Sequence, residues 1–167
     1  QNTWTYVGSH SIDAGLCDSA PQYDNACNVD ADVEVFAVSY SYTPSTITIE
    51  VGQTVTWTNN GGYHDVNGAT DSQTDVSFNN PESFSIGAVS AISNEDLCIG
   101  TYTFTVPGIY NYDCSIGSHA AQGMVGTITV GVGGCTDALA PNYDATADWD
   151  DETCEAVACT IFFSEYA

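Results

Sequence analysis

Two blocks of alternating residues constrain the fold of this chain more than any other feature. In residues 33–58 and 101–130, apolar and polar side chains alternate, and Thr, Val, Ile and Tyr are the commonest residues. A period of two with these residue types favours half-buried β-strands. Gly, Pro and Asn separate the runs about every ten residues, which is typical of a sandwich. The sequence therefore predicts an all-β fold, a Greek-key β-sandwich.

The segments around these blocks predict the domain organisation. We expect one or two strands in residues 77–97, with a short helical turn in 88–97. Residues 133–155 are small and acidic, so they need a disulfide to fold. The final residues, IFFSEYA, form an apolar strand-like run, so we expect the chain to belong to a larger polypeptide. The expected parts are an N-terminal extension (1–32), the sandwich (33–131), an acidic Cys-stapled module (132–158) and the start of a following domain (159–167).

Seven cysteines indicate an oxidising compartment, so we expect an extracellular, cell-surface or periplasmic protein. Six of them can pair, in 15 connectivities, and one is left over. Locality and then elimination predict three bridges: Cys17–Cys27, Cys135–Cys154 and Cys98–Cys159.

The charge balance excludes several classes of partner. The chain has 22 acidic residues and no Lys or Arg, which gives a net charge of −22. Nucleic acids and anionic membrane surfaces are therefore excluded, because both are bound by cationic side chains. No apolar run reaches the ~18 residues of a membrane-spanning segment. The acidity is consistent with steering of a basic redox partner or with solubility in a salty medium, and its spread along the chain favours solubility.

A cluster of soft ligands points to copper. Cys114, His119 and Met124 have the spacing C-x4-H-x4-M in a loop between two expected strands, and His64 follows the strand that ends at Thr58. One thiolate, two imidazoles and one thioether form the ligand set of a mononuclear type 1 copper site. Three ligands on one short loop also converge at little cost in chain entropy. The sequence predicts one copper ion bound by His64, Cys114, His119 and Met124.

Each of these residues also has an ordinary structural interpretation. A lone cysteine or methionine in a sandwich commonly fills the core, and we interpret His10 as a surface residue. Calcium is a second cofactor to weigh, but the spacing of the acidic residues of the C-terminal module does not match an EF-hand, and a solvated acidic face is the simpler interpretation. The oxygen ligands in question are Asp137, Asn142, Asp144, Asp148, Asp150 and Asp151.

Residues 33–131 resemble the cupredoxin (blue copper) family. The resemblance is carried by T-I-T-I, G-Q-T-V-T-W-T-N, H-D-V, P-G-I-Y-N-Y-D-C and G-M-V-G-T-I-T-V. The spacing of Cys114, His119 and Met124 is similar to that of plant phytocyanins, although Ala120 stands where phytocyanins usually have a cysteine after the second histidine. The rest of the sequence is more similar to bacterial plastocyanin-like proteins. Most members have Asn where this chain has Asp65, which we expect to hydrogen-bond toward Ser115 and to lower the reduction potential.

The C-terminal module resembles a short GCTD-type segment of secreted proteins from Bacteroidetes-like marine bacteria. The run IFFSEYA resembles the opening strand of a lamin-tail-like domain in such proteins. Both resemblances imply a secreted or cell-surface setting.

The cupredoxin resemblance implies an electron-transfer protein that cycles Cu(II)/Cu(I) and exchanges electrons with a redox partner through His119. A copper enzyme is the less favoured hypothesis, because oxidases and nitrite reductases need further histidines and this chain has three. The alternative is a structural or adhesive cupredoxin-like module of a larger surface protein.

Overall fold

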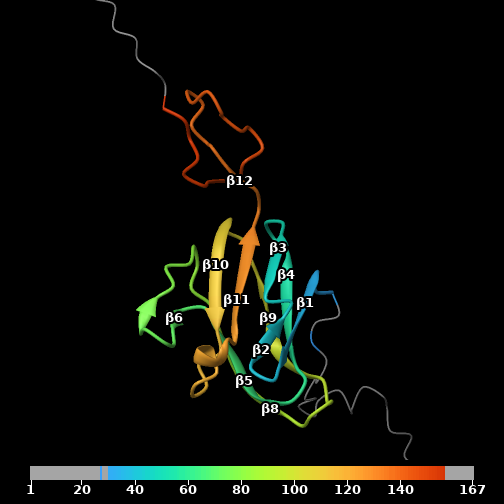
Figure 1. Cartoon of the computed structure of the whole chain (residues 1–167). Helices are drawn as coiled ribbons and strands as arrows, with labels where there is room; N and C mark the ends of the chain where they lie inside the picture. Colours follow the sequence, from blue (N-terminus) through green and yellow to red (C-terminus); the bar gives the residue numbers. More distant parts are fainter. Residues whose placement is uncertain (1–26, 28–29, 157–167) are drawn as a thin grey trace, which may run out of the picture.

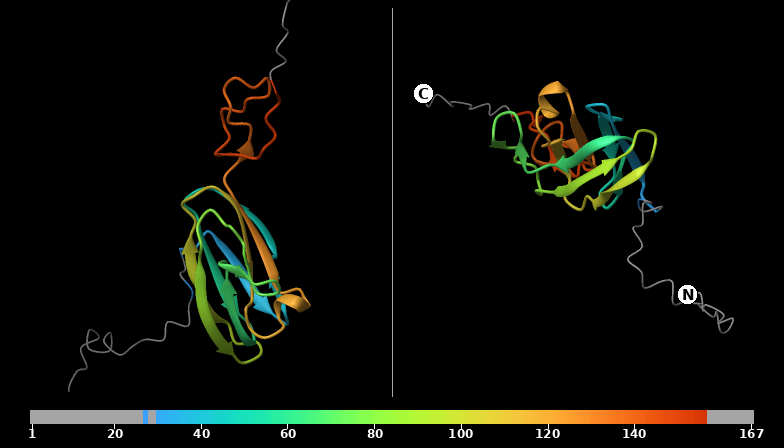
Figure 2. Two further views of the ribbon diagram at one scale, coloured as in Figure 1. Left: turned by 90° about the vertical axis from the view of Figure 1, so that its left-hand side faces the viewer. Right: turned by 90° about the horizontal axis from the view of Figure 1, so that it is seen from below.

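The computed structural model describes residue 27 and residues 30–156 of the 167-residue chain. Two sheets pack face to face in this part (Figures 1 and 2). One has four strands in the order β2-β1-β4-β9: Ser41–Thr43, Val33–Val38, Thr54–Asn59 and Leu97–Thr103. The other has five strands in the order β3-β11-β10-β5-β8: Thr46–Ile49, Val125–Val130, Gly108–Asp113, Gly62–Asn67 and Ser85–Ala91.

The chain crosses repeatedly between the two sheets. As a result β1 pairs in parallel with β4, and β3 pairs in parallel with β11, while the other pairs within the two sheets are antiparallel. Two short pairs stand outside the sandwich: β6 (Thr70–Asp71) with β7 (Val76–Ser77), and β12 (Gly133–Gly134) with β13 (Trp149–Asp150). The predicted all-β sandwich is confirmed. Among the described residues, none of the helices has the length and hydrophobicity of a membrane-spanning segment.

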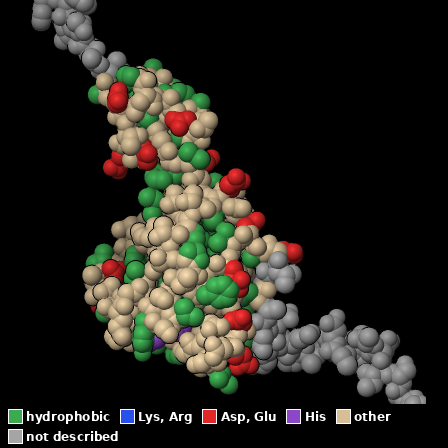
Figure 3. All heavy atoms as spheres, turned by 45° about the vertical axis from the view of Figure 1, so that its right-hand side comes forward, with side chains coloured by type: hydrophobic (Ala, Val, Ile, Leu, Met, Phe, Trp, Pro, Cys, Tyr) green, Lys and Arg blue, Asp and Glu red, His purple; other side chains and the backbone are tan. Residues whose placement is uncertain are grey.

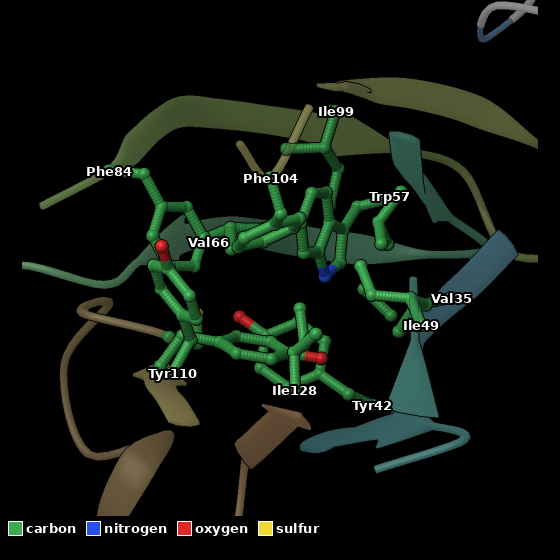
Figure 4. Packing of buried hydrophobic residues seen from close by; sticks show 14 of the residues in the cluster. Val35, Tyr42, Ile49, Trp57, Val66, Phe84, Ile99, Phe104, Tyr110 and Ile128 are labelled. Atoms are coloured by element: carbon green, nitrogen blue, oxygen red, sulfur yellow. The ribbon is translucent and has the colours of Figure 1, made fainter. Parts of the chain in front are cut away.

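The core lies between the sheets and is rich in aromatic rings (Figure 4). Trp57 is fully buried, with its ring centroid 5.7 Å from Tyr112 and 6.0 Å from Phe84. Phe104 and Tyr110 extend the cluster, with ring centroids 4.8 Å apart. Each such side chain contributes about 1.5–3 kcal/mol on burial. The alternation seen in the sequence thus directs one face of each sheet into a common core.

The expected helical turn in 88–97 is wrong. β8 continues to Ala91, and after a tight turn β9 begins at Leu97. In the turn, Asn94 adopts a left-handed backbone conformation (φ 65°), which Asn tolerates better than most residues, and its N–H donates to the carbonyl of Asn60. Pairing of β8 with β5 and the contact with Asn60 therefore override the local helical tendency.

Two disulfides are present among the described residues, and they correct the predicted pairing. Cys135–Cys154 is confirmed, but Cys27 pairs with Cys98, so Cys17–Cys27 and Cys98–Cys159 are wrong. Cys98 lies opposite Thr58 in the β4–β9 pair, and the hydroxyl of Thr58 lies 3.5 Å from the sulfur of Cys27. Strand pairing therefore brings together cysteines that are 71 residues apart. Cys17 and Cys159 themselves lie outside the described residues.

The acidic Cys-stapled module, which we call the C-terminal module, is described over residues 132–156. It extends from the end of β11 that is far from the loop connecting β10 and β11 (Figures 1 and 2). The backbone N–H of Val132 donates to the carboxylate of Asp148, and Gly133 packs directly against the ring of Trp149. A Cβ at Gly133 would lie 2.8 Å from that ring, so a larger residue there would displace the ring. The proposed division into extension, sandwich, module and following domain stays a prediction.

Candidate metal centre

The loop between β10 and β11, residues 114–124, is held at both ends by these two neighbouring strands, and we call it the ligand loop. β10 ends at Asp113 and β11 begins at Val125, and these two residues are register partners. Cys114 and Met124 therefore face each other at the base of the loop, where the N–H of Cys114 donates to the carbonyl of Met124 (3.1 Å). His119 lies in the middle of the loop, just before the short 3-10 helix Ala120–Gln122. Its backbone carbonyl accepts a hydrogen bond from the N–H of Met124 (3.1 Å). These two hydrogen bonds close the loop that carries Cys114, His119 and Met124.

His64 comes from β5, the strand next to β10 in the same sheet. Its side chain is 3% exposed, and its Nε2 lies 3.1 Å from the carbonyl of Gly61. A carbonyl oxygen only accepts, so Nε2 carries the proton and Nδ1 has a free lone pair. That Nδ1 lies 3.8 Å from Sγ of Cys114. The Gly61 contact thus fixes the tautomer of His64 and leaves Nδ1 directed toward Cys114, available to a metal.

Three of the four expected ligands converge on one point. Nδ1 of His119 lies 3.4 Å from Sγ of Cys114, and the ligand atoms of His64, Cys114 and His119 all lie within 4.8 Å of one another. Cys114 and Met124 are fully buried, whereas His119 is partly exposed. The structure therefore brings together residues 50 positions apart and places the only methionine at the base of the same loop.

The environment of the thiol opposes its ionisation in the metal-free protein. Burial raises the pKa of Cys114 to about 11, and the nearby Asp65 carboxylate acts in the same direction, while backbone N–H groups of Asp65 and Ile116 oppose it. Burial, followed by the neighbouring His119, lowers the pKa of His64. A neutral imidazole is the form that binds metals. A bound soft cation would compensate the negative charge of the Cys114 thiolate in this buried position.

Asp65 joins the two segments that carry these side chains. Its Oδ1 accepts the N–H of Ser115 at 2.7 Å, its Oδ2 accepts the hydroxyl of the same residue, and its backbone carbonyl accepts the hydroxyl of Tyr42 at 2.5 Å. The expected hydrogen bond toward Ser115 is confirmed. β5, the ligand loop and β2 are thereby held in one network.

Sequence reasoning missed two contributors to the site. Gly62 lies against His64, and a Cβ there would be 2.9 Å from Nε2 of that ring. Tyr40 meets the ring of His119 edge-on, with the centroids 4.8 Å apart. Tyr40 and Gly62 both line a hollow of about 330 Å³ beside the two histidines. The signals available in the sequence were the Gly61-Gly62 pair and the break between two strand-like runs at Ser39-Tyr40, and neither indicates a contact with a histidine.

The donor set fits copper. One sulfur and two imidazole nitrogens converge in a buried site with a methionine at the loop base, and this combination of soft and intermediate ligands suits copper. Among the described residues, the acidic side chains of the C-terminal module gather no comparable group, so calcium finds no support there. His10 lies outside the described residues. Figure 3 shows histidine atoms reaching the surface at the end of the sandwich away from the module.

Known proteins are similar to more than half of this chain. Residues 27–131 match the family model "Copper binding proteins, plastocyanin/azurin family". The plastocyanin of Scenedesmus fuscus is 35% identical over 94 residues, which is 53% of this chain and 85% of that protein. The chloroplastic plastocyanin of Hordeum vulgare is 34% identical over 93 residues, 53% of this chain and 54% of that protein.

Solved structures of amicyanin variants are also similar. A reduced variant is 22% identical with a TM-score of 0.45, and the match covers 62% of this chain and 85% of the amicyanin chain. An oxidised variant is 23% identical with a TM-score of 0.43, and the match covers 61% of this chain and 84% of the amicyanin chain. The family model spans well over half of the chain and the algal plastocyanin is matched over most of its length, so this chain belongs to the plastocyanin/azurin family of copper-binding proteins, the cupredoxins.

Proposed function

We propose that this protein is an electron carrier with one type 1 copper site formed by Nδ1 of His64 and His119, Sγ of Cys114 and the thioether of Met124. The observation that carries the proposal is the convergence of one sulfur and two imidazole nitrogens within 4.8 Å in a buried site. Copper bound there supplies the Cu(II)/Cu(I) couple that accepts and donates one electron.

The protein's own contribution is a rigid set of ligands. Gly61 orients His64, the Asp65–Ser115 hydrogen bonds hold the cysteine segment against β5, and the backbone of Met124 closes the loop. Ligands that are held in place before the metal changes oxidation state need little rearrangement during electron transfer. Burial of Cys114 and Met124 also keeps water away from the sulfur ligands.

The path for electrons runs through His119. Of the three converging side chains, only that of His119 is partly exposed, and Cys114 and His64 are buried. Small exposed residues, Gly117 and Ala121, lie on the same loop and allow close approach. We propose a redox protein as the partner, and we expect its contact surface to carry no excess of negative charge, because this chain has a net charge of −22.

The setting follows from the disulfides. Cys27–Cys98 and Cys135–Cys154 are stable in oxidising compartments, so we propose a secreted, cell-surface or periplasmic protein. We propose a carrier rather than an enzyme, because three histidines cannot build the additional copper centres of an oxidase or nitrite reductase.

A structural or adhesive role in a larger surface protein is the second candidate. The C-terminal module favours it, because Leu139 is 81% exposed there and Tyr143 is 48% exposed beside acidic residues. Exposed apolar side chains mark an interaction site where they group into a patch. Both roles are compatible in one molecule.

Metal analysis and visible spectroscopy of the isolated protein test the proposal. The expected result is one copper per chain and an intense thiolate-to-copper absorption that disappears on reduction. Cys114→Ser should abolish the absorption, whereas Cys135→Ser with Cys154→Ser should leave it unchanged. A colourless protein that takes up no added copper would overturn the carrier function and leave the structural role. Zinc in the isolated sample is exchanged for copper before the measurement, since zinc binds the same residue types.

A further inference from the structure

The turn between β1 and β2 has an unusual backbone for its residues. Val38 and Ser41 are register partners, so Ser39 and Tyr40 form a two-residue turn, with φ angles of 42° and 66°. Two central residues with positive φ define a type I′ turn, in which Asn-Gly is strongly preferred. A bulky aromatic residue in this conformation is a genuine outlier. Such outliers persist where the surroundings hold them, and they cluster at functional sites.

The ring of Tyr40 lies against the metal site. It meets the ring of His119 at an interplanar angle of 80°, with the centroids 4.8 Å apart. Both rings line the hollow beside His64, and Tyr40 remains 45% exposed. The strained turn thus holds an aromatic ring between the solvent and the most exposed metal-binding imidazole.

The two histidines are held in different ways. Nε2 of His64 donates to the carbonyl of Gly61, as metal-binding histidines commonly do through their second nitrogen. Within the described part of the chain, no hydrogen bond holds the second nitrogen of His119. Its ring is instead flanked by the rings of Tyr40 and His64, with centroids 4.8 Å and 5.1 Å away. Aromatic packing therefore orients the ring of His119, as the hydrogen bond to Gly61 orients the ring of His64.

We propose that Tyr40 is a positioning residue that holds the imidazole of His119 in its metal-binding orientation and covers the route by which copper leaves. The Ser39-Tyr40 turn keeps a backbone conformation that is unfavourable for tyrosine because this conformation directs the ring onto His119. This inference rests on the copper site proposed above and goes beyond it by assigning a role to a residue that is not a ligand.

Four variants separate the ring from the turn. Tyr40→Gly removes the ring and suits the backbone, Tyr40→Phe keeps the ring, and Ser39→Gly relaxes the neighbouring position only. Tyr63→Ala is the matched control, because Tyr63 lines the same hollow and is 51% exposed but has an ordinary strand backbone. Loss of Cu(I) from each reduced protein to the chelator bathocuproine disulfonate is followed by absorbance.

Tyr40→Gly should release copper about tenfold faster than the wild-type protein, as expected for loss of a group that orients a ligand. Tyr40→Phe, Ser39→Gly and Tyr63→Ala should release it at the wild-type rate. Equal rates for Tyr40→Gly and the wild-type protein would overturn the proposal, as would an equal acceleration in Tyr63→Ala. The metal-free form of Tyr40→Gly should also unfold at the wild-type temperature or above, which separates the effect on copper from a general loss of stability.

A second readout needs no copper. In the metal-free proteins, modification of His119 by diethyl pyrocarbonate should be faster in Tyr40→Gly than in the wild-type protein, because the covering ring is gone, and unchanged in Tyr40→Phe. Trypsin cannot cleave a chain without Lys or Arg, but cleavage before aspartate after reduction places His64 and His119 on separate peptides, 32–64 and 113–136. Unchanged modification of His119 in Tyr40→Gly would contradict the proposal even if the wild-type protein bound no copper, so the two failures are distinguishable.

Discussion

The carboxylate of Asp65 accepts two hydrogen bonds from Ser115, one from the backbone N–H at 2.7 Å and one from the hydroxyl. Asp65 follows His64 in β5, and Ser115 follows Cys114, so this pair joins the neighbours of two proposed copper ligands. Asp65 is 9% exposed, and the chain contains no Lys or Arg that would offset its charge. The network therefore both fixes the geometry of the site and places negative charge beside it.

Asp65→Asn should raise the reduction potential of the copper site. A nearby negative charge favours Cu(II) over Cu(I), and asparagine removes the charge while its carbonyl still accepts the N–H of Ser115. We expect the equilibrium with a redox mediator to shift about tenfold toward Cu(I), which is about 59 mV for one electron. Spectroelectrochemical titration measures it.

Glu50→Gln is the control for this variant, because it removes the same charge at an exposed position that follows β3, far from the site (Figure 1). A potential that is unchanged or lower in Asp65→Asn would refute the assigned role.

Gly62→Ala should weaken copper binding by about 10–100-fold, because the added Cβ would lie 2.9 Å from Nε2 of His64 and displace the ring. Gly52→Ala is matched in backbone strain, with φ of 90° against 97° for Gly62, but its Cβ would meet no atom within 4 Å. Competition with a copper chelator measures both affinities. Equal losses in the two variants would show that backbone strain, and not the contact with His64, is responsible.

Replacing Cys27 and Cys98 together with serine should lower the free energy of unfolding by about 4 kcal/mol, because this bridge closes a loop of 71 residues. The copper spectrum should remain, since neither sulfur belongs to the site. Urea unfolding followed by tryptophan fluorescence measures the change, and non-reduced peptide mapping checks the pairing. A Cys27–Cys17 peptide in the mapping would contradict the bridge.

Removal of copper should lower the unfolding temperature, because an ion that binds only the folded state stabilises it by about 2.7 kcal/mol at a free concentration of 100 Kd. Cys114→Ala should abolish this dependence on copper, because its side chain offers no thiolate to the metal. Calorimetric scans with and without copper test the prediction, and equal shifts in both proteins would place the stabilising ion elsewhere.

The sequence predicted the sandwich and the proximity of His64, Cys114 and His119 for identifiable physical reasons. The alternation in β3, β4 and β11 is strong, and Cys114, His119 and Met124 lie on one short loop, so little topology was needed to bring them together. The Cys27–Cys98 bridge was missed because locality was the only guide, whereas pairing of β4 with β9 decides which cysteines meet. Tyr40 was missed because no sequence pattern reports which turn faces the ligand loop.

The position of the C-terminal module has a consequence for how the protein would work when tethered. β11 begins next to Met124, runs through six residues and ends at Val130, close to the module. At about 3.3 Å per residue, this strand separates the two ends of the sandwich by roughly 20 Å. Anchoring through the module would therefore leave the histidine-bearing end facing outward, free to meet one diffusing partner after another.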